Sequence, residues 1–219
     1  MRGYKFLNKD FGLKSLNERR LKQSRIHELN DPFELAPYDL TNPRVRYAFL
    51  SVRNALGREN GLLCLSASWQ DPVIWAHYAD KHQGICLGFE IPRITGDGGS
   101  DIAKRVTYVS RPLRFPAEFL SLPQAGQLKH TNRIPFTKFK HWAYEKEIRV
   151  WGRLSNEEDG LHFFEFEQRM RLVEVRVGAN CTLTRSAIMR ALGASADDTR
   201  VIKVRAAYNR FAMVQDEEW

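Results

Sequence analysis

Two glutamates stand two residues apart in the stretch WAYEKEIRVW, residues 142–151. If this stretch is a β-strand, successive side chains alternate between its faces, so Glu145, Glu147 and Arg149 share one face. Two carboxylates in this arrangement lie roughly 6.5–7 Å apart. Burial of that face would displace their ionisation equilibria, as catalytic acids and bases require. The alternative is a half-exposed strand in which Glu147 and Arg149 form a weak surface pair.

A second candidate group lies on the stretch QDPVIWAHYADKHQG. Asp71 is suited to cap a helix and Pro72 to begin it, while Gly84 follows its end. Trp75, Tyr78 and His82 then fall on one helical face. Such a stripe is typical of a core, and the histidine of a satisfied core residue; the alternative is a cofactor-binding face.

The third candidate is NDPFE, residues 30–34. Asn30 or Asp31 can bond to the backbone ahead of it, and the proline fixes one dihedral angle. One interpretation is a turn held in place by insertion of Phe33. The other is that the turn presents Asp31 or Glu34 to a cleft beside Tyr4 and Lys5, and the sequence leaves both open.

The surrounding patterns indicate the elements that position these residues. Apolar runs and turn residues predict alternating strands and helices early in the chain and mostly strands later. We expect strands at 4–7, 21–24, 61–68, 85–91, 106–109, 142–152, 162–167, 172–178 and 201–214, and helices at about 12–20, from 43, 72–83 and 184–194. This pattern predicts an α+β fold with a mixed, mostly antiparallel sheet flanked by helices.

The chain of 219 residues suits a single domain, 1–219. Four prolines between 111 and 135 predict a long irregular excursion, of a length that favours function or disorder. The glycine-rich residues 93–101 predict a loop, but they lack the glycine order of a dinucleotide fingerprint and the lysine of a phosphate-binding loop.

The net charge of +8 favours encounter with phosphate-rich or acidic partners. The basic residues are scattered along the chain, however, which is equally typical of a solvated surface. Nucleic acid therefore stays open as a partner.

Several classes of site and location are not indicated. The three cysteines, Cys64, Cys86 and Cys181, form no C-x-x-C pair, and the six histidines show no ligand spacing, so we expect no metal site. No apolar run approaches the roughly 20 residues of a membrane helix, and the N-terminus lacks a secretory signal. We therefore expect a cytoplasmic protein with no membrane partner.

The order of motifs resembles a bacterial family catalogued as a domain of unknown function. The residues that carry the resemblance are an early Tyr-Lys pair, NDPFE, WAHYADKHQGICLGFE and WAYEKEIRVW. The plan of that family is similar to the ADP-ribosyltransferase fold, whose split mixed sheet binds NAD. The resemblance thus implies an NAD-cleaving enzyme, of the toxin or anti-phage effector type, that transfers ADP-ribose to a macromolecule or to water.

The resemblance also implies roles for individual residues. Glu147 would be the carboxylate that stabilises the oxocarbenium-like transition state, and Glu145 would serve the acceptor. Tyr4 or Lys5 would hold the dinucleotide, although that fold usually has histidine or arginine on the first strand. The ADP-ribosyltransferase fold also has a serine on its second strand, and in this chain that strand corresponds either to LKQS or to LCLSAS, which contains Ser66.

The resemblance further implies that Tyr78 and Trp75 stack on nicotinamide or adenine. Asp31, Glu34, His82 and Arg149 complete the candidates for the cleft. NAD would be the substrate, and nucleic acid or protein the acceptor. The alternatives are a nucleic-acid-binding module without enzymatic activity, and a metal-dependent nuclease.

Overall fold

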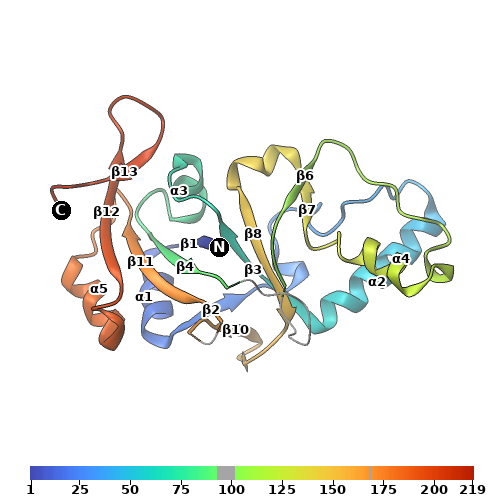
Figure 1. The fold of residues 1–219 in the computed structure, drawn as a ribbon, viewed down its shortest axis with the longest axis horizontal. Helices are drawn as coiled ribbons and strands as arrows, with labels where there is room; N and C mark the ends of the chain where they lie inside the picture. The colour runs from blue at the N-terminus through green and yellow to red at the C-terminus, as the bar shows by residue number, and fades with distance from the viewer. Residues whose placement is uncertain (93–101, 168) are drawn as a thin grey trace.

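A mostly antiparallel sheet runs through the middle of the molecule (Figure 1). The structure is a computed structural model that describes residues 1–92, 102–167 and 169–219. The expected loop at 93–101 therefore lies outside the described residues. Within them the main sheet has eight strands, which are, in spatial order, β13 (Met213–Gln215), β12 (Arg200–Ala206), β11 (Arg171–Val177), β4 (Ile85–Glu90), β1 (Arg2–Leu7), β3 (Asn60–Ser66), β8 (Glu147–Arg153) and β5 (Ile102–Arg105).

Strand pairing confirms the predicted α+β class with a mixed, largely antiparallel sheet. In the main sheet, β11 and β12 are parallel and are joined through α5, whereas the other neighbouring strands are antiparallel. Two smaller sheets are described besides it: β2 (Arg20–Gln23) with β10 (Leu161–Glu165) and β9 (Glu157–Glu158), and the parallel pair β6 (Thr107–Val109) with β7 (Thr137–Phe139).

The helices begin where their capping residues indicate. Asn42 and Asp71 accept backbone N–H bonds at the starts of α2 and α3, each followed by proline at the first helical position. The helices are α1 (Lys9–Glu18), α2 (Pro43–Glu59), α3 (Pro72–Tyr78), α4 (Gln124–Thr131) and α5 (Arg185–Leu192), with 3₁₀ turns η1 (Ile26–Glu28), η2 (Phe119–Ser121), η3 (Lys140–Glu145) and η4 (Gly193–Ser195).

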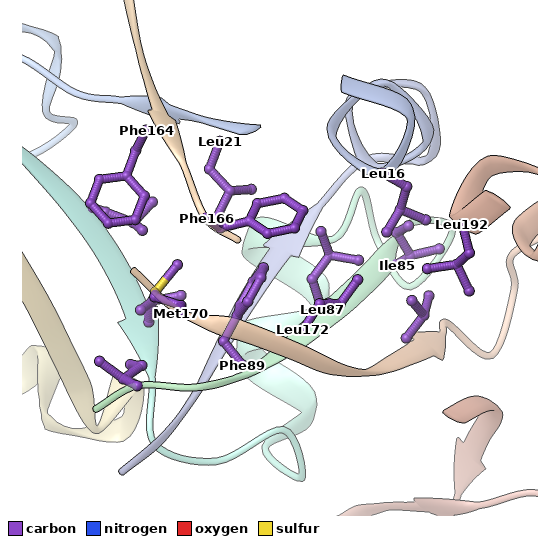
Figure 2. Close-up of a cluster of buried hydrophobic side chains, with 14 of the residues drawn as sticks. Leu16, Leu21, Ile85, Leu87, Phe89, Phe164, Phe166, Met170, Leu172 and Leu192 are labelled. Carbon is purple, nitrogen blue, oxygen red and sulfur yellow. The ribbon is translucent and has the colours of Figure 1, made fainter. Parts of the chain in front are cut away.

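The two faces of the main sheet differ in what covers them. One face packs on α1, α5 and β10, where Leu16, Phe166 and Leu192 meet Ile85 and Phe89 in an apolar cluster (Figure 2). The opposite face carries α3, and we call it the α3 face. Another apolar cluster joins α2 to the residues around α4. These two helices lie at one end of the molecule, away from the centre of the sheet (Figure 1). The candidate site lies on the α3 face.

Four predicted elements differ from the structure. The first is α1, which begins at Lys9, not near Gly12, because Asn8 caps it. The second is α3, which ends at Tyr78 because Asp80, Lys81 and His82 adopt positive φ angles and turn the chain toward Gly84.

The third difference is at the strand predicted for 142–152. Its first part is η3, and Lys146 has a φ of 46°, so regular strand geometry begins only at Glu147. The fourth is the strand predicted for 201–214, which is a hairpin formed by β12 and β13. In both cases a turn interrupts the predicted strand.

The segment 111–135 was expected to be irregular, yet it contains η2 and α4. Phe115 and Phe119 from this segment are buried, and Phe115 contacts Phe49 of α2. The prolines therefore limit the length of the helices but do not prevent packing. No helix in the described ranges is both long and apolar enough to cross a membrane.

Leu16 offers a test of the apolar cluster that supports the sheet. Its side chain is fully buried between α1, the sheet and α5, so Leu16→Ala should lower the free energy of unfolding by about 2–5 kcal/mol. Leu120→Ala, at an exposed position, should change it by less than about 0.5 kcal/mol. Urea denaturation measures both, and equal effects would contradict this assignment of the core.

Candidate functional site

A cavity lies where two neighbouring strands of the main sheet barely pair. β1 pairs with β4 along its whole length, Arg2–Leu7. With β3 on its other side, it shares a single register pair among the described residues, Tyr4↔Ser66. The cavity has a volume of about 280 Å³. It is lined by Tyr4, Lys5, Phe6, Ser24, Glu28, Leu29, Asn30, Glu34, Cys64, Leu65, Ser66, Ile74, Tyr78, Lys138, Glu145 and Glu147.

Strand register brings the polar residues to the α3 face. Tyr4 lies opposite Ser66, and Ser66 lies opposite Glu147, so the three side chains share that face. Cys64 and Arg149 are likewise opposite each other, two residues further along β3 and β8. Glu147 and Arg149 therefore share a face, as the alternation in the sequence predicted, and this face is buried.

Lys138 is the centre of a buried ion cluster. Its Nζ lies 2.8 Å from Glu34 Oε1, 2.7 Å from Glu145 Oε2 and 3.3 Å from Glu147 Oε2. The ring of Trp142 lies over the same ammonium group, 4.8 Å from it. One cation thus gathers Glu34 from near the start of the chain and two carboxylates that follow it closely in sequence.

Arg149 supplies the second cation of the cluster and is fully buried. Its Nε and Nη2 donate to the two oxygens of Glu147 at 2.8 and 3.0 Å, which is a bidentate pair. Nη2 also donates to Glu34 Oε2 at 2.6 Å, and Nη1 donates to the carbonyl oxygen of Pro135 at 2.9 Å. This excludes the weak surface pair as the role of Arg149.

The NDPFE turn delivers Glu34 to the cluster. The Glu34 N–H donates to the carbonyl of Asp31, and Leu35 has a φ of 53°. Phe33 is 74% exposed, so the interpretation in which it anchors the turn is wrong, and the buried anchor is Leu35. Asp31 does not line the cavity; its carboxylate instead accepts bonds from the Phe33 N–H and from Trp142 Nε1.

The turn at Lys146 places the two glutamates of the ExE pair in different elements. Glu145 ends η3 and Glu147 begins β8, so strand alternation does not explain their proximity. The Ser66 hydroxyl donates to the carbonyl oxygen of Glu145 at 2.6 Å, and the Ala67 N–H donates to that of Lys146. Tyr78 donates its hydroxyl proton to Glu145 Oε1 at 2.6 Å.

The surroundings move the pKa values of the two glutamates in opposite directions. Burial raises the pKa of Glu145 above its ordinary value, although Lys138 and Tyr78 act against this rise. Burial also acts to raise the pKa of Glu147, but the charge and hydrogen bonds of Arg149, together with Lys138, outweigh it and hold that pKa below its ordinary value. Paired groups with diverging pKa values are typical of acid–base assignments in active sites.

Lys5 differs from Lys138 in its electrostatic surroundings. Its Nζ donates to the carbonyl oxygen of Cys64 at 3.2 Å, and no carboxylate in the described ranges lies within ion-pair distance of it. Burial lowers the pKa of Lys5, whereas three carboxylates raise that of Lys138 in spite of its burial. The cavity thus contains one tightly paired lysine and one available donor.

Two predicted binding residues do not reach the cavity. Trp75 is fully buried, contacts Phe6 edge-on and donates Nε1–H to the carbonyl of Trp69 at 2.6 Å, so it is a core residue. His82 lies beyond the end of α3, where the chain has turned, and borders a different pocket. The early end of α3 explains only the position of His82, while Ile74 and Tyr78 face the cavity from the helix.

The sequence reasoning missed Lys138 and Tyr108. Lys138 lies in β7 as the single charge between Phe136 and Phe139, a pattern that indicates a buried lysine in need of carboxylates. Tyr108 lies on the paired strand β6, and its hydroxyl oxygen accepts the N–H of Glu147 at 2.8 Å. Its burial raises its pKa to about 12, so it stays protonated at neutral pH.

The sequence reasoning also missed a second buried Glu-x-Arg pair. Glu174 and Arg176 in β11 form an ion pair of 2.8 Å, and register places Glu174 beside Gly88, which lies opposite Tyr4. The signal was present in LVEVRVG, where the two charges alternate with valine. In the part of the chain that the structure describes, no group of three His, Cys, Asp or Glu side chains is arranged to hold a metal ion.

Comparison with known proteins bears on part of the chain. Residues 74–150 match a family described as "Protein of unknown function (DUF2971)". This segment includes Tyr78, Lys138, Glu145, Glu147 and Arg149, and the match supports the expected kinship with a domain of unknown function. No curated protein and no solved structure matches the chain.

Substitution of each glutamate by glutamine tests the ion cluster. At pH 7 Glu147→Gln leaves Arg149 without its bidentate partner and should cost about 3–5 kcal/mol of the free energy of unfolding. Glu145→Gln should cost less, because burial already favours the uncharged form of that group.

The two substitutions should also respond oppositely to pH. Because its pKa is lowered in the folded protein, Glu147 stabilises the fold at pH values above the ordinary carboxyl pKa, and this stabilisation is lost as the pH falls. The cost of Glu147→Gln should therefore grow from acid toward neutral pH. A raised pKa gives Glu145 a contribution that is present at acid pH and lost as the pH rises, so the cost of Glu145→Gln should shrink over that range. Urea titrations at several pH values measure both trends, and parallel trends would contradict the assignment.

Proposed function

We propose that the protein cleaves the N-glycosidic bond of NAD and transfers the ADP-ribosyl group to a macromolecule or to water. The observation that carries this proposal is the pair Glu145 and Glu147, which lines one cavity with pKa values displaced in opposite directions. Cleavage and transfer need both groups: Glu147 as a permanent negative charge and Glu145 as a group that exchanges a proton.

Glu147 suits the stabilisation of developing positive charge. When the bond between ribose C1′ and the nicotinamide nitrogen breaks, its electron pair leaves with neutral nicotinamide, and positive charge spreads over C1′ and the ring oxygen. The Glu147 carboxylate is held in place by Arg149 and stays ionised, so it needs no reorganisation as that charge appears.

Glu145 suits the second half of the reaction. A water molecule or an acceptor hydroxyl adds its oxygen to C1′ and releases a proton. A carboxylate whose pKa is raised toward neutrality is a better base for that proton than an ordinary one. Tyr78 orients this carboxylate through its hydroxyl bond of 2.6 Å.

The charge and size of the cavity support a nicotinamide riboside, whose positive charge is on the ring nitrogen in NAD and moves to the sugar as the glycosidic bond breaks. Among the lining residues, Glu28, Glu34, Glu145 and Glu147 outnumber Lys5 and Lys138, although the whole chain is basic. A volume of about 280 Å³ lies at the lower end of the 300–1,000 Å³ typical of ligand pockets. We therefore propose that the nicotinamide ribose enters the cavity and that the ADP portion lies outside.

Lys5 and Tyr4 are the proposed contacts for the sugar and phosphate. An ammonium group has three donors, and the described structure uses one of them on the carbonyl of Cys64. Tyr4 lines the same cavity from the neighbouring position on β1. Lys5 thus has donors left for oxygen atoms of a ligand in the cavity.

Release of nicotinamide from NAD tests the role of Glu147. Purified protein should release nicotinamide, and Glu147→Gln should slow that release about 10²–10³-fold, since it removes the charge that faces C1′. Glu147→Asp keeps the charge but withdraws it by one methylene, and it should also lose most of the activity.

Glu28→Gln is the matched control, because Glu28 lines the cavity but contacts Lys22 rather than Lys138. It should retain activity, and circular dichroism should show each variant folded. Unchanged release by both Glu147 variants would exclude Glu147 as the catalytic carboxylate. A nucleic-acid-binding module would give no release in any variant.

Tyr78→Phe tests the proposed base. The Tyr78 hydroxyl acts to lower the pKa of Glu145, so its removal should raise that pKa further. The acidic limb of the pH–rate profile for ADP-ribose transfer to water should then move to higher pH, while the plateau changes little. Tyr47→Phe, on the exposed side of α2, is the control and should leave the profile in place.

A further inference from the structure

The loop between β12 and β13 presents two aromatic side chains to solvent. Tyr208 is 91% exposed and Phe211 is 101% exposed. The loop projects beyond the rest of the fold at the end of the molecule that is opposite α2 and α4 (Figure 1). Burial of a large apolar side chain stabilises a protein by about 1.5–3 kcal/mol, and these two exposed rings do not contribute that stabilisation. Paired exposed rings of this kind therefore indicate a surface for a partner.

The loop is ordered by its own hydrogen bonds. The Ala207 N–H donates to the carbonyl of Ala212 at 2.9 Å, directly beyond the register pair Ala206↔Met213. The Met213 N–H donates to the carbonyl of Gln70 at 2.8 Å, which ties the hairpin to the start of α3. The rings are thus held outward by a fixed backbone.

The charges of the hairpin are of one sign. Residues 204–215 contain Arg205 and Arg210 and no acidic residue. The guanidinium carbon of Arg205 lies 4.4 Å from the centre of the Tyr208 ring. The Arg205 guanidinium lies over the Tyr208 ring, which is still 91% exposed and open to stacking.

A groove adjoins the rings. It has a volume of about 670 Å³, and its walls are the hairpin residues 206–213 together with Pro72, His82, Ala179 and Asn180. Its lining includes four alanines, and Asn180 and Asn209 supply amide groups that can donate and accept hydrogen bonds. A flat heterocycle with donors and acceptors at its edges fits such a surface.

We propose that this hairpin binds single-stranded nucleic acid. Bases stack on Tyr208 and Phe211, and Arg205 and Arg210 contact the phosphates. Sequence-tolerant binding of single strands depends on exposed aromatic rings within a basic surface. The absence of acidic residues from 204–215 and the net charge of +8 favour a polyanion over a protein partner.

The site stands independently of the NAD-cleaving activity. Its groove borders α3 at Pro72 and the turn after α3 at His82, while the cavity borders the helix at Ile74 and Tyr78. One further step rests on the proposed function: the nucleic-acid strand bound at the hairpin lies beside the cavity and is the acceptor of ADP-ribose.

Fluorescence anisotropy of labelled oligo(dT) and oligo(U), without NAD, tests the proposal. The wild-type protein should bind at low salt and lose affinity steeply between 50 and 200 mM salt, as expected for phosphate contacts. The double variant Tyr208→Ala/Phe211→Ala should bind at least about tenfold more weakly, since each base loses its stacking partner. Both side chains are exposed, so the variant should keep its melting temperature. Tighter binding of oligo(U) than of oligo(dT) would assign RNA as the ligand, and the reverse would assign DNA.

Tyr47→Ala is the matched control, because Tyr47 is 78% exposed on α2 at the other end of the molecule. It should bind as the wild type does. Absence of oligonucleotide binding, or binding unaffected by the double substitution, would overturn the proposal. Nicotinamide release by the double variant should be unchanged, so loop-dependent binding without any NAD cleavage would reject only the proposed function.

Discussion

The fold around the candidate site depends on the buried ion cluster centred on Lys138. Three carboxylates cannot share a buried volume unless cations offset their repulsion, and Lys138 and Arg149 supply two. The cluster joins a turn near the N-terminus, strand β7 and strand β8. Removal of any member changes the balance of the buried charges, which makes this network both a structural tie and a source of displaced pKa values.

The weak pairing between β1 and β3 is the second constraint. A continuous ladder would close the sheet and leave no cavity, but the strands share the pair Tyr4↔Ser66, and side chains from both then border an open volume. The α3 face thereby acquires polar residues that a packed sheet would exclude. The opposite face keeps a continuous apolar cluster that stabilises the sheet across this gap.

Helix α3 connects the features of functional interest. It delivers Tyr78 to Glu145 on one side, and its first residue borders the groove of the β12–β13 hairpin on the other. Its early end, forced by positive φ angles at 80–82, decides which side chains reach each site. The turn leaves the His82 ring stacked against Trp75, with 6.4 Å between the ring centres, rather than in the cavity.

The sequence by itself determined the fold class, the helix starts at Pro43 and Pro72, and the shared face of Glu147 and Arg149, because caps and strand alternation are local properties. It could not determine that Lys138 gathers Glu34, Glu145 and Glu147, since this depends on the contact with Glu34, which is distant in the chain, and on the turn that places Glu145 and Glu147 beside the cation. The turns at Lys146 and between β12 and β13 were not predicted either, although Lys146 departs from the strand alternation and Asn209 and Arg210 interrupt the apolar residues of 201–214. Only tertiary structure decided those points, because a left-handed residue or a hairpin is stabilised by what packs against it.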